Sequence, residues 1–161
     1  MGESRSIEIT DLDQLQSYVE ALCGSARQRL DILTPDLEPR LYDREPVLAS
    51  LRDLATAGRQ ASIRILVADG NAALTQSPRL VELARQLTSF FELRRLAAAD
   101  AGFGQAAIIA DGRSLLHRPE WTRHEATVEM NAPARARTLL ETFDALWARA
   151  APDPETRRLH L

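Results

Sequence analysis

Two histidines bracket a short polar loop in the second half of the chain, and their side chains are the most reactive groups there. His117 and His124 are separated by Arg-Pro-Glu-Trp-Thr-Arg, so a tight connection would bring the two rings together. An imidazole can serve as a nucleophile or general base when a carboxylate such as Asp111 or Glu125 orients its second ring nitrogen. The same side chains with Glu120 could bind zinc, but their spacing matches no strong zinc motif, and surface histidines at strand ends are more common.

Three arginines accompany these histidines on the same hairpin and loop. Arg113, Arg118 and Arg123 carry guanidinium forks, which suit the recognition of phosphate or carboxylate groups, although a solvated arginine-rich loop is the commoner arrangement. The candidate anion pocket consists of Asp111, Arg113, His117, Arg118, Arg123, His124 and Glu125. The main prediction for these residues is ligand binding, with no catalytic role, no cofactor and no metal ion.

Several chemistries are excluded by what the sequence lacks. All 20 residues in the lysine-plus-arginine count are arginine, so Schiff-base chemistry and a P-loop lysine are ruled out. Residues 102–107 match the G-x-G-x-x-A dinucleotide pattern, but they lead into a strand where a nucleotide site needs a helix. Neither Ser77 nor Ser114 has the G-x-S-x-G context of a serine hydrolase.

The composition is that of one soluble globular domain. The 161 residues are 45% hydrophobic and 27% charged, and no apolar run approaches the roughly 18 residues of a membrane span. A net charge of −3 argues against general nucleic-acid binding, which needs many cations. Because the N-terminus also lacks an apolar signal-peptide core, we expect a protein of bacterial-type cytoplasm without membrane insertion. Cys23 lies in an apolar helical pattern, which predicts a buried, inert thiol.

Hydrophobic periodicity divides the first hundred residues into alternating strands and helices. Asp11, with Gln14 three residues later, predicts a capping box for the first helix. Asp43 is the expected cap of the second helix, and Ser77 with Pro78 is expected to start the third. We expect strands at 7–10, 30–34, 61–68 and 90–96, helices at 11–29, 45–57 and 78–87, and loops at 34–39 and 69–71.

The last third of the chain predicts a β-hairpin and a long helix. An apolar run ends on Asp111-Gly112, a dipeptide that accepts the positive φ angles of a tight two-residue turn, and a second apolar run follows. A further strand is expected at 124–130 and a helix at 132–149; Trp121 should pack against its own domain, with a dimer contact or pocket lid as the alternative. The order β-α-β-α-β-α-β-β-β-β-α predicts an α/β fold with a mixed sheet, first parallel and then antiparallel, and helices on both faces.

This element order, with a strand that closes on Asp-Gly, resembles one repeat of the phospholipase D-like superfamily from about Leu30 to Ala150. In that family the strand reads His-x-Lys-x-x-x-x-Asp-Gly, and the histidine attacks the phosphorus of a phosphodiester. When the family's aspartate is placed on Asp111, its histidine falls on Gly104 and its lysine on Ala106. The resemblance therefore implies the fold without the reactive groups.

Other features of the family are incomplete or unspecific. The Gly-Ser pair that follows the family's hairpin is replaced near Arg118-Pro119, and of the later Asn-x-Glu step only Glu125 matches. Residues 135–147 look like the family's closing helix. The implied protein is a catalytically inactive phospholipase D-like domain over residues 1–150 with a loose tail at 151–161. Because repeats of this superfamily usually work in pairs around a two-fold axis, a homodimer is also implied.

The residues and the resemblance together lead to two hypotheses. The first is a non-catalytic, homodimeric binding or regulatory domain for a small anionic or phosphoryl ligand or a protein partner. The alternative is a phosphodiester hydrolase or transferase with a rearranged site that uses His117 or His124.

Overall fold

An eight-stranded mixed sheet runs through the part of the chain that the computed structural model describes, residues 5–57 and 60–152. The strands are β1 (Ser6–Ile9), β2 (Arg29–Thr34), β3 (Ser62–Val67), β4 (Phe91–Arg95), β5 (Ala106–Ala110), β6 (Ser114–Arg118), β7 (Ala126–Glu129) and β8 (Ala151–Pro152). They lie side by side in the order β1-β7-β6-β5-β2-β3-β4-β8. β2, β3 and β4 pair in parallel and the other pairs are antiparallel, which confirms the predicted α/β class and mixed sheet.

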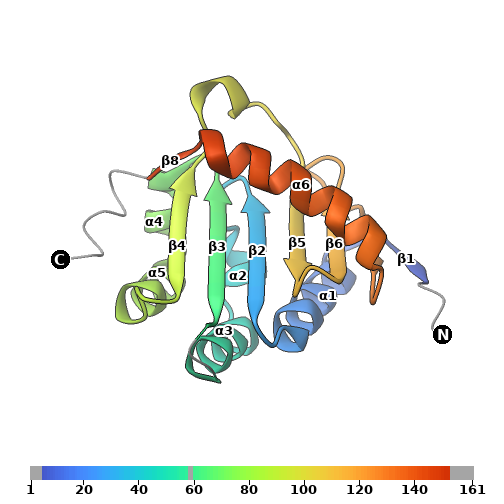
Figure 1. Cartoon of the computed structure of the whole chain (residues 1–161), viewed down its shortest axis with the longest axis horizontal. Helices are drawn as coiled ribbons and strands as arrows, with labels where there is room; N and C mark the ends of the chain where they lie inside the picture. Colours follow the sequence, from blue (N-terminus) through green and yellow to red (C-terminus); the bar gives the residue numbers. More distant parts are fainter. Residues whose placement is uncertain (1–4, 58–59, 153–161) are drawn as a thin grey trace.

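Helices cover both faces of this sheet. They are α1 (Leu12–Ser25), α2 (Pro39–Tyr42), α3 (Glu45–Ala57), α4 (Gly70–Gln76), α5 (Pro78–Gln86) and α6 (Pro133–Arg149), with a 3-10 turn at Ala98–Asp100. Figure 1 shows α6, in red, crossing one face of the strands, while α1, α3 and α5 lie on the other face. Successive strand residues point to opposite faces of the sheet, so there are two apolar cores. Ile108 of β5 packs in the core on the α1 side, and its neighbour Ile109 packs in the core under α6.

The β5–β6 hairpin turns at the predicted Asp111-Gly112 dipeptide, but three residues, 111–113, separate its last pair, Ala110 and Ser114, where two are predicted. Asp111 and Gly112 both have positive φ angles, 56° and 64°, and the Arg113 N–H donates to the Ala110 carbonyl across 3.0 Å. Two successive positive φ values define the mirror-image turn that matches strand twist. The turn fixes the register of the hairpin, so that Ala106 at its open end pairs with Arg118.

Some helix boundaries differ from those predicted. The first helix ends at Ser25 rather than near Arg29, because Ala26 is extended and the next N–H groups bond to Asp111 instead of to helical carbonyls. The predicted loop at 34–39 is confirmed for residues 35–38, since β2 ends at Thr34 and the short helix α2 starts at Pro39. The predicted loop at 69–71 is instead the start of α4, which Asp69 caps by accepting from the Ala72 N–H.

Two predicted caps also act differently. Asp43 does not cap α3; its carboxylate accepts from the Leu80 N–H in the first turn of α5, 3.0 Å away. Ser77 does stand at the start of α5, but its hydroxyl donates to the Leu37 carbonyl and makes no capping bond. Each side chain therefore joins two segments that are distant in sequence.

Three other predictions can be compared with the structure. The expected loose tail is ordered at its start, because Ala151–Pro152 forms β8 against β4; its remainder, 153–161, lies outside the described residues. Cys23 is buried as predicted, and burial, with a smaller effect of Glu20, raises the pKa of its thiol to about 12. Trp121 is partly buried against the core under α6, so it packs on its own domain.

Candidate functional site

At one end of the strands lie five of the seven candidate residues: His117 and Arg118 at the end of β6, and Arg123, His124 and Glu125 in the loop that follows. Parallel strands β2 and β3 end at this edge, β5 begins there, and β6 ends there, because Leu33 of β2 pairs with Ala107 and Ala106 pairs with Arg118. In open α/β sheets, ligands bind in the crevice beyond the carboxyl ends of the strands. This edge is therefore where a site of this fold is expected.

The two positions that correspond to the reactive pair of the resembled family are unsuited to large side chains. Gly104 has a φ of 80°, a left-handed conformation that side-chain-bearing residues adopt with strain, and its carbonyl accepts from the Trp121 N–H at 2.8 Å. Ala106 is only 1% exposed and lies on the same face of the hairpin as Ile108. Neither residue offers a reactive group.

Arg118 pairs with Ala106 across the hairpin, and most N–H donors of its guanidinium are already hydrogen-bonded. Its side chain is buried, and its guanidinium donates hydrogen bonds to both carboxylate oxygens of Glu38, with Nη2–Oε2 at 3.2 Å. The same guanidinium donates to the carbonyls of Trp121, at 2.6 Å, and Arg123, at 2.8 and 3.1 Å. A bidentate pair of this kind is strong and directional. Arg118 thus ties the loop after β6 to the segment after β2.

An acidic cleft of about 300 Å³ opens next to this ion pair. Its ionisable groups belong to Asp36, Glu38, Arg40 and His124. The rest of its wall is formed by Leu12, Pro39, Leu41 and Gln76. Burial, followed by the charges of Glu38 and Asp69, raises the pKa of the Asp36 carboxyl against the opposing influence of Arg118. A like-charged neighbourhood of this kind disfavours ionisation and repels a further anion.

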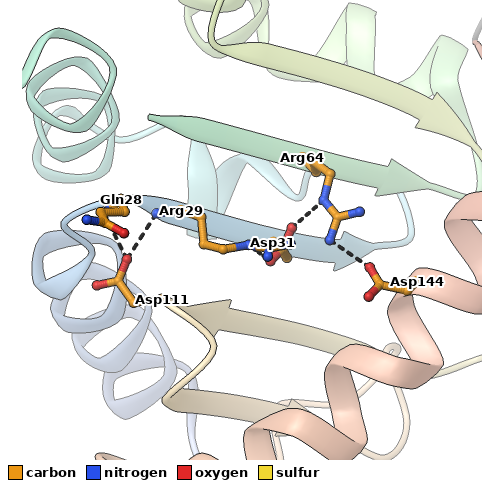
Figure 2. Close-up of polar contacts among 6 residues, drawn as sticks. All are labelled: Gln28, Arg29, Asp31, Arg64, Asp111 and Asp144. Carbon is orange, nitrogen blue, oxygen red and sulfur yellow. Dashed lines mark hydrogen bonds and ion pairs between the residues drawn. The ribbon is translucent and has the colours of Figure 1, made fainter. Parts of the chain in front are cut away.

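Asp111 lies at the opposite end of the hairpin and has a structural task. Its carboxylate accepts from the backbone N–H groups of Arg27, Gln28 and Arg29 at 2.8 to 3.0 Å. Figure 2 shows the bonds to Gln28 and Arg29. These bonds hold the β5–β6 turn against the segment that enters β2. Arg113 belongs to the same turn, and its carbonyl accepts from the Ala132 N–H ahead of α6.

His117 faces α6, on the other side of the sheet from Arg118. Its Nε2 lies 2.8 Å from the Gln105 side-chain oxygen. Burial, and to a lesser extent the positive charge of Arg135, lowers the pKa of His117, which favours the neutral ring near pH 7. His117 and His124 therefore line different hollows and do not form a pair.

The structure thus divides the seven candidate residues among separate places. Asp111 and Arg113 lie at the turn, His117 lies under α6, and Arg118 is locked by Glu38. His124 is in the acidic cleft, while Arg123 and Glu125 are exposed on the loop before β7. Within residues 5–57 and 60–152, no three histidine, cysteine, aspartate or glutamate side chains form a cluster able to hold a metal ion.

Sequence reasoning missed the acidic residues of the cleft. Asp36 and Glu38 lie in the loop predicted at 34–39, and their place directly after a buried parallel strand is a recognisable signal for a site. Gln105 and Arg135, which contact or influence His117, carry no such signal because their proximity depends on how α6 crosses the sheet.

A chain of charges runs from a buried aspartate of the sheet to an exposed one on α6. Asp31 of β2, only 1% exposed, accepts from Arg64 of β3 at 2.7 Å, and the same guanidinium reaches Asp144 of α6 at 2.8 Å (Figure 2). The Arg64 guanidinium also lies over the ring of Phe143, 4.8 Å from its centroid. This network joins α6 to the sheet.

Comparisons with known proteins identify the fold but not an activity. A family model described as a domain of unknown function (DUF7931) matches residues 11–159, and none of the curated proteins matches the sequence. Nuc, a phospholipase D family member from Salmonella typhimurium, superposes with a TM-score of 0.67 at 15% identity, covering 92% of this chain and 97% of Nuc. NucT from Helicobacter pylori superposes with a TM-score of 0.65 at 10% identity, covering 93% of this chain and 99% of NucT.

A third similar structure is TrmBL2, an archaeal chromatin protein described as having a novel mode of DNA binding. Its TM-score is 0.67 at 15% identity, and the match covers 92% of this chain and 54% of TrmBL2. At such identities the likeness concerns the fold, and it confirms the predicted phospholipase D-like architecture. None of the helices in the described part of the chain is long and apolar enough to cross a membrane.

Proposed function

This chain belongs to the DUF7931 family, a domain of unknown function, and we propose that it is a non-catalytic binding or regulatory module for a small anionic or phosphoryl ligand that acts as a homodimer. The proposal is carried by Gly104 and Ala106, which stand where the resembled family has its reactive histidine and lysine. Position 104 has a backbone conformation that favours glycine, and position 106 is sealed in the core, so neither presents a nucleophile or a cation at the edge of the sheet.

The Arg118–Glu38 pair gives further support. A phosphoryl group at this edge would need free donors, but the Arg118 guanidinium already serves one carboxylate and two backbone carbonyls. The adjacent cleft is lined by Asp36 and Glu38 as well as by Arg40, so it presents no cluster of free cations to a phosphate. We therefore place the anionic ligand elsewhere on the domain than in the pocket of the resembled family.

The test is a phosphodiesterase assay with bis(p-nitrophenyl) phosphate. We expect the same background release of nitrophenol from the wild-type protein and from a His117→Ala/His124→Ala double variant purified in parallel. Turnover that saturates with substrate in the wild type and disappears in the double variant would refute the non-catalytic assignment.

The homodimer is tested separately by light scattering coupled to gel filtration. Over a micromolar concentration range, we expect a mass twice that of the chain. The chain's own mass at every concentration would remove this part of the proposal and leave the non-catalytic part standing.

The alternative function, a phosphodiester hydrolase or transferase, has one observation in its favour. His124 lines the same cleft as Asp36 and Glu38, and burial raises the pKa of Asp36, which is the direction that a general acid requires. His117 lies on the other face of the sheet and is outside this arrangement. Activity that His124→Ala and Asp36→Asn each abolish, and that His117→Ala leaves intact, would support this alternative.

A further inference from the structure

A second hollow, of about 200 Å³, lies between the β5–β6 hairpin and the first half of α6. Its lining residues are Gln105, Leu115, His117, Arg135, Thr138, Leu139 and Thr142. A narrow apolar crevice of about 10 Å³ adjoins it, bounded in part by Leu33, Phe103 and Phe143. The two share Gln105, His117, Leu139 and Thr142, so a polar mouth leads to an apolar floor. Concave sites with a few convergent polar groups on an apolar surface are typical of ligand pockets.

Two neutral polar groups at the mouth have bonding capacity left. The Gln105 side-chain oxygen lies 2.8 Å from Nε2 of His117, so that nitrogen donates the bond. In the neutral ring, which the lowered pKa favours near pH 7, Nδ1 is then an acceptor. The amide NH₂ of Gln105 makes no hydrogen bond within the described residues, so it remains able to donate to a ligand.

Arg135 supplies the positive charge at the mouth. Its Nη2 lies 3.4 Å from Oε2 of Glu129, a carboxylate on β7 whose side chain is 9% exposed. That oxygen is buried and has no hydrogen-bond partner among the described residues, so the ion pair anchors the arginine by one edge. A guanidinium has five N–H donors, and the 63% exposed side chain keeps some of them available.

We propose that this hollow binds a small organic carboxylate, with the carboxylate held by Arg135 and the Gln105 amide and the apolar body lying against Leu115 and Leu139. That the ligand is an anion rests on the proposed function. The site under α6 and the carboxylate class of the ligand are new here. The face under α6 is opposite to the face that carries Gly104, Ala106 and Arg118, so this pocket is distinct from the one that the fold family uses.

The charge balance of the hollow favours a monoanion with an apolar part. Arg135 is the one cation among the lining residues, since His117 is held neutral, and Glu129 already offsets part of its charge. One partly neutralised guanidinium matches one carboxylate, whereas a phosphate dianion would keep uncompensated charge beside Glu129. Leu115, Leu139 and the crevice exclude a ligand that is polar throughout.

The experiment is an NMR titration of the full chain with benzoate, with benzyl alcohol and inorganic phosphate as comparison ligands. We expect benzoate to shift the amide signals of Gln105 and His117 saturably, and to bind at least about tenfold more tightly than the other two, the size of one charge-assisted hydrogen bond. Equal affinity for benzyl alcohol, tighter binding of phosphate, or no saturable shift would each overturn the proposal.

Variants locate the site. Arg135→Gln/Glu129→Gln removes the cation without leaving Glu129 buried and unpaired, and Gln105→Leu removes the amide while keeping the ion pair. Each should weaken benzoate binding at least about tenfold. Arg137→Gln, an exposed arginine one position beyond Ala136 on α6 and outside the hollow, should leave the affinity unchanged. Unchanged affinity in both pocket variants would overturn the proposal.

His117 gives a readout that a purely structural pocket would not show. The charged groups near its ring are Arg135 on α6 and, through that arginine, Glu129 on β7, and Gln105 faces it from the segment before β5. An anion beside the ring favours the imidazolium, so saturating benzoate should raise the NMR pKa of His117, and affinity should increase as pH falls. An unchanged His117 pKa in the bound state would contradict the assigned position. Phosphodiester turnover, in contrast, would overturn the non-catalytic function without removing the pocket.

Discussion

At the scale of single residues, Asp111 shows why a motif can survive without its chemistry. The aspartate matches the resembled family's motif, yet its carboxylate binds the backbone N–H groups of residues 27–29 and holds the turn against the entry of β2. The carboxylate of Asp111 thus has a structural role, whereas Gly104 and Ala106 carry no reactive group.

Asp111→Ala should lower the free energy of unfolding by about 2–4 kcal/mol, because three donors lose a charged acceptor and alanine is strained at a φ of 56°. Asp111→Asn is the matched control, since asparagine tolerates this backbone conformation and keeps one acceptor oxygen. It should lose about half as much. Urea unfolding followed by circular dichroism measures both. An equal loss in the two variants would show that the charged carboxylate carries the whole effect and that backbone strain contributes nothing.

His117 should titrate below its ordinary pKa of 6.5, because burial and then Arg135 disfavour the charged ring. The unfolded chain then binds more protons than the folded one between the lowered pKa and 6.5. Stability should therefore increase as pH rises through this window, be complete above 6.5, and be lost as pH falls. NMR titration gives the pKa, and unfolding curves of His117→Gln should lack this part of the pH dependence. A pKa at or above 6.5 in the free protein would contradict the expectation.

At the scale of elements, the crossing of α6 over the sheet decides what the second hollow contains. Arg64 couples Asp31 in the sheet to Asp144 on the helix, and the stacked rings of Phe143 and Trp147 lie beneath neighbouring arginines. The helix brings Arg135 and Thr142 over β6 because of this docking. Any substitution that loosens α6 should therefore also disturb the pocket.

Arg64→Met should cost about 2–4 kcal/mol of unfolding free energy, since it leaves the buried Asp31 with Arg29 as its remaining cation, at 3.2 Å. Asp144→Asn is the control: its side chain is 52% exposed, so its ion pair should contribute less than about 1 kcal/mol. Hydrogen exchange should show faster exchange along α6 in Arg64→Met and near wild-type rates in Asp144→Asn. Similar protection of α6 in both variants would mean that packing alone docks the helix.

The elements themselves were largely predictable from local patterns. Apolar alternation located the long strands, and Asp111-Gly112 specified the hairpin turn because its φ angles depend on the dipeptide itself. The short helices α2 and α4 were missed, as was the pairing of β8, because each depends on tertiary contacts. The same holds for the sites: the sequence brought seven residues together along the chain, but alternation sends His117 and Arg118 to opposite faces.

At the scale of the whole molecule, the net charge of −3 sets this chain's expected behaviour towards nucleic acid. TrmBL2 shares the fold and is described as binding DNA, but a fold does not transfer that property. Charge-driven binding requires many arginine or lysine contacts to phosphates, whereas the edge cleft here is lined by Asp36 and Glu38.

We therefore expect no change in the fluorescence anisotropy of a labelled DNA duplex at 50 mM salt, up to protein concentrations near 100 μM. That range covers the usual non-specific dissociation constants of about 1–100 μM. Binding at 50 mM salt that weakens steeply at 200 mM would contradict this prediction. It would show that a local basic surface binds the DNA phosphates in spite of the negative net charge.

The first and last strands of the described chain, β1 and β8, are the two outer edges of the sheet (Figure 1). Force applied between residues 5 and 152 would therefore act across the strands and peel them outward. The β4–β8 ladder, with two paired positions, would open before the β1–β7 ladder, which has four. Because peeling loads a few hydrogen bonds at a time, the two edge strands should detach at low tension. The chain order then passes the force through α1 to β2 and through α6 to β7, so resistance should rise when the load reaches β2 between β3 and β5.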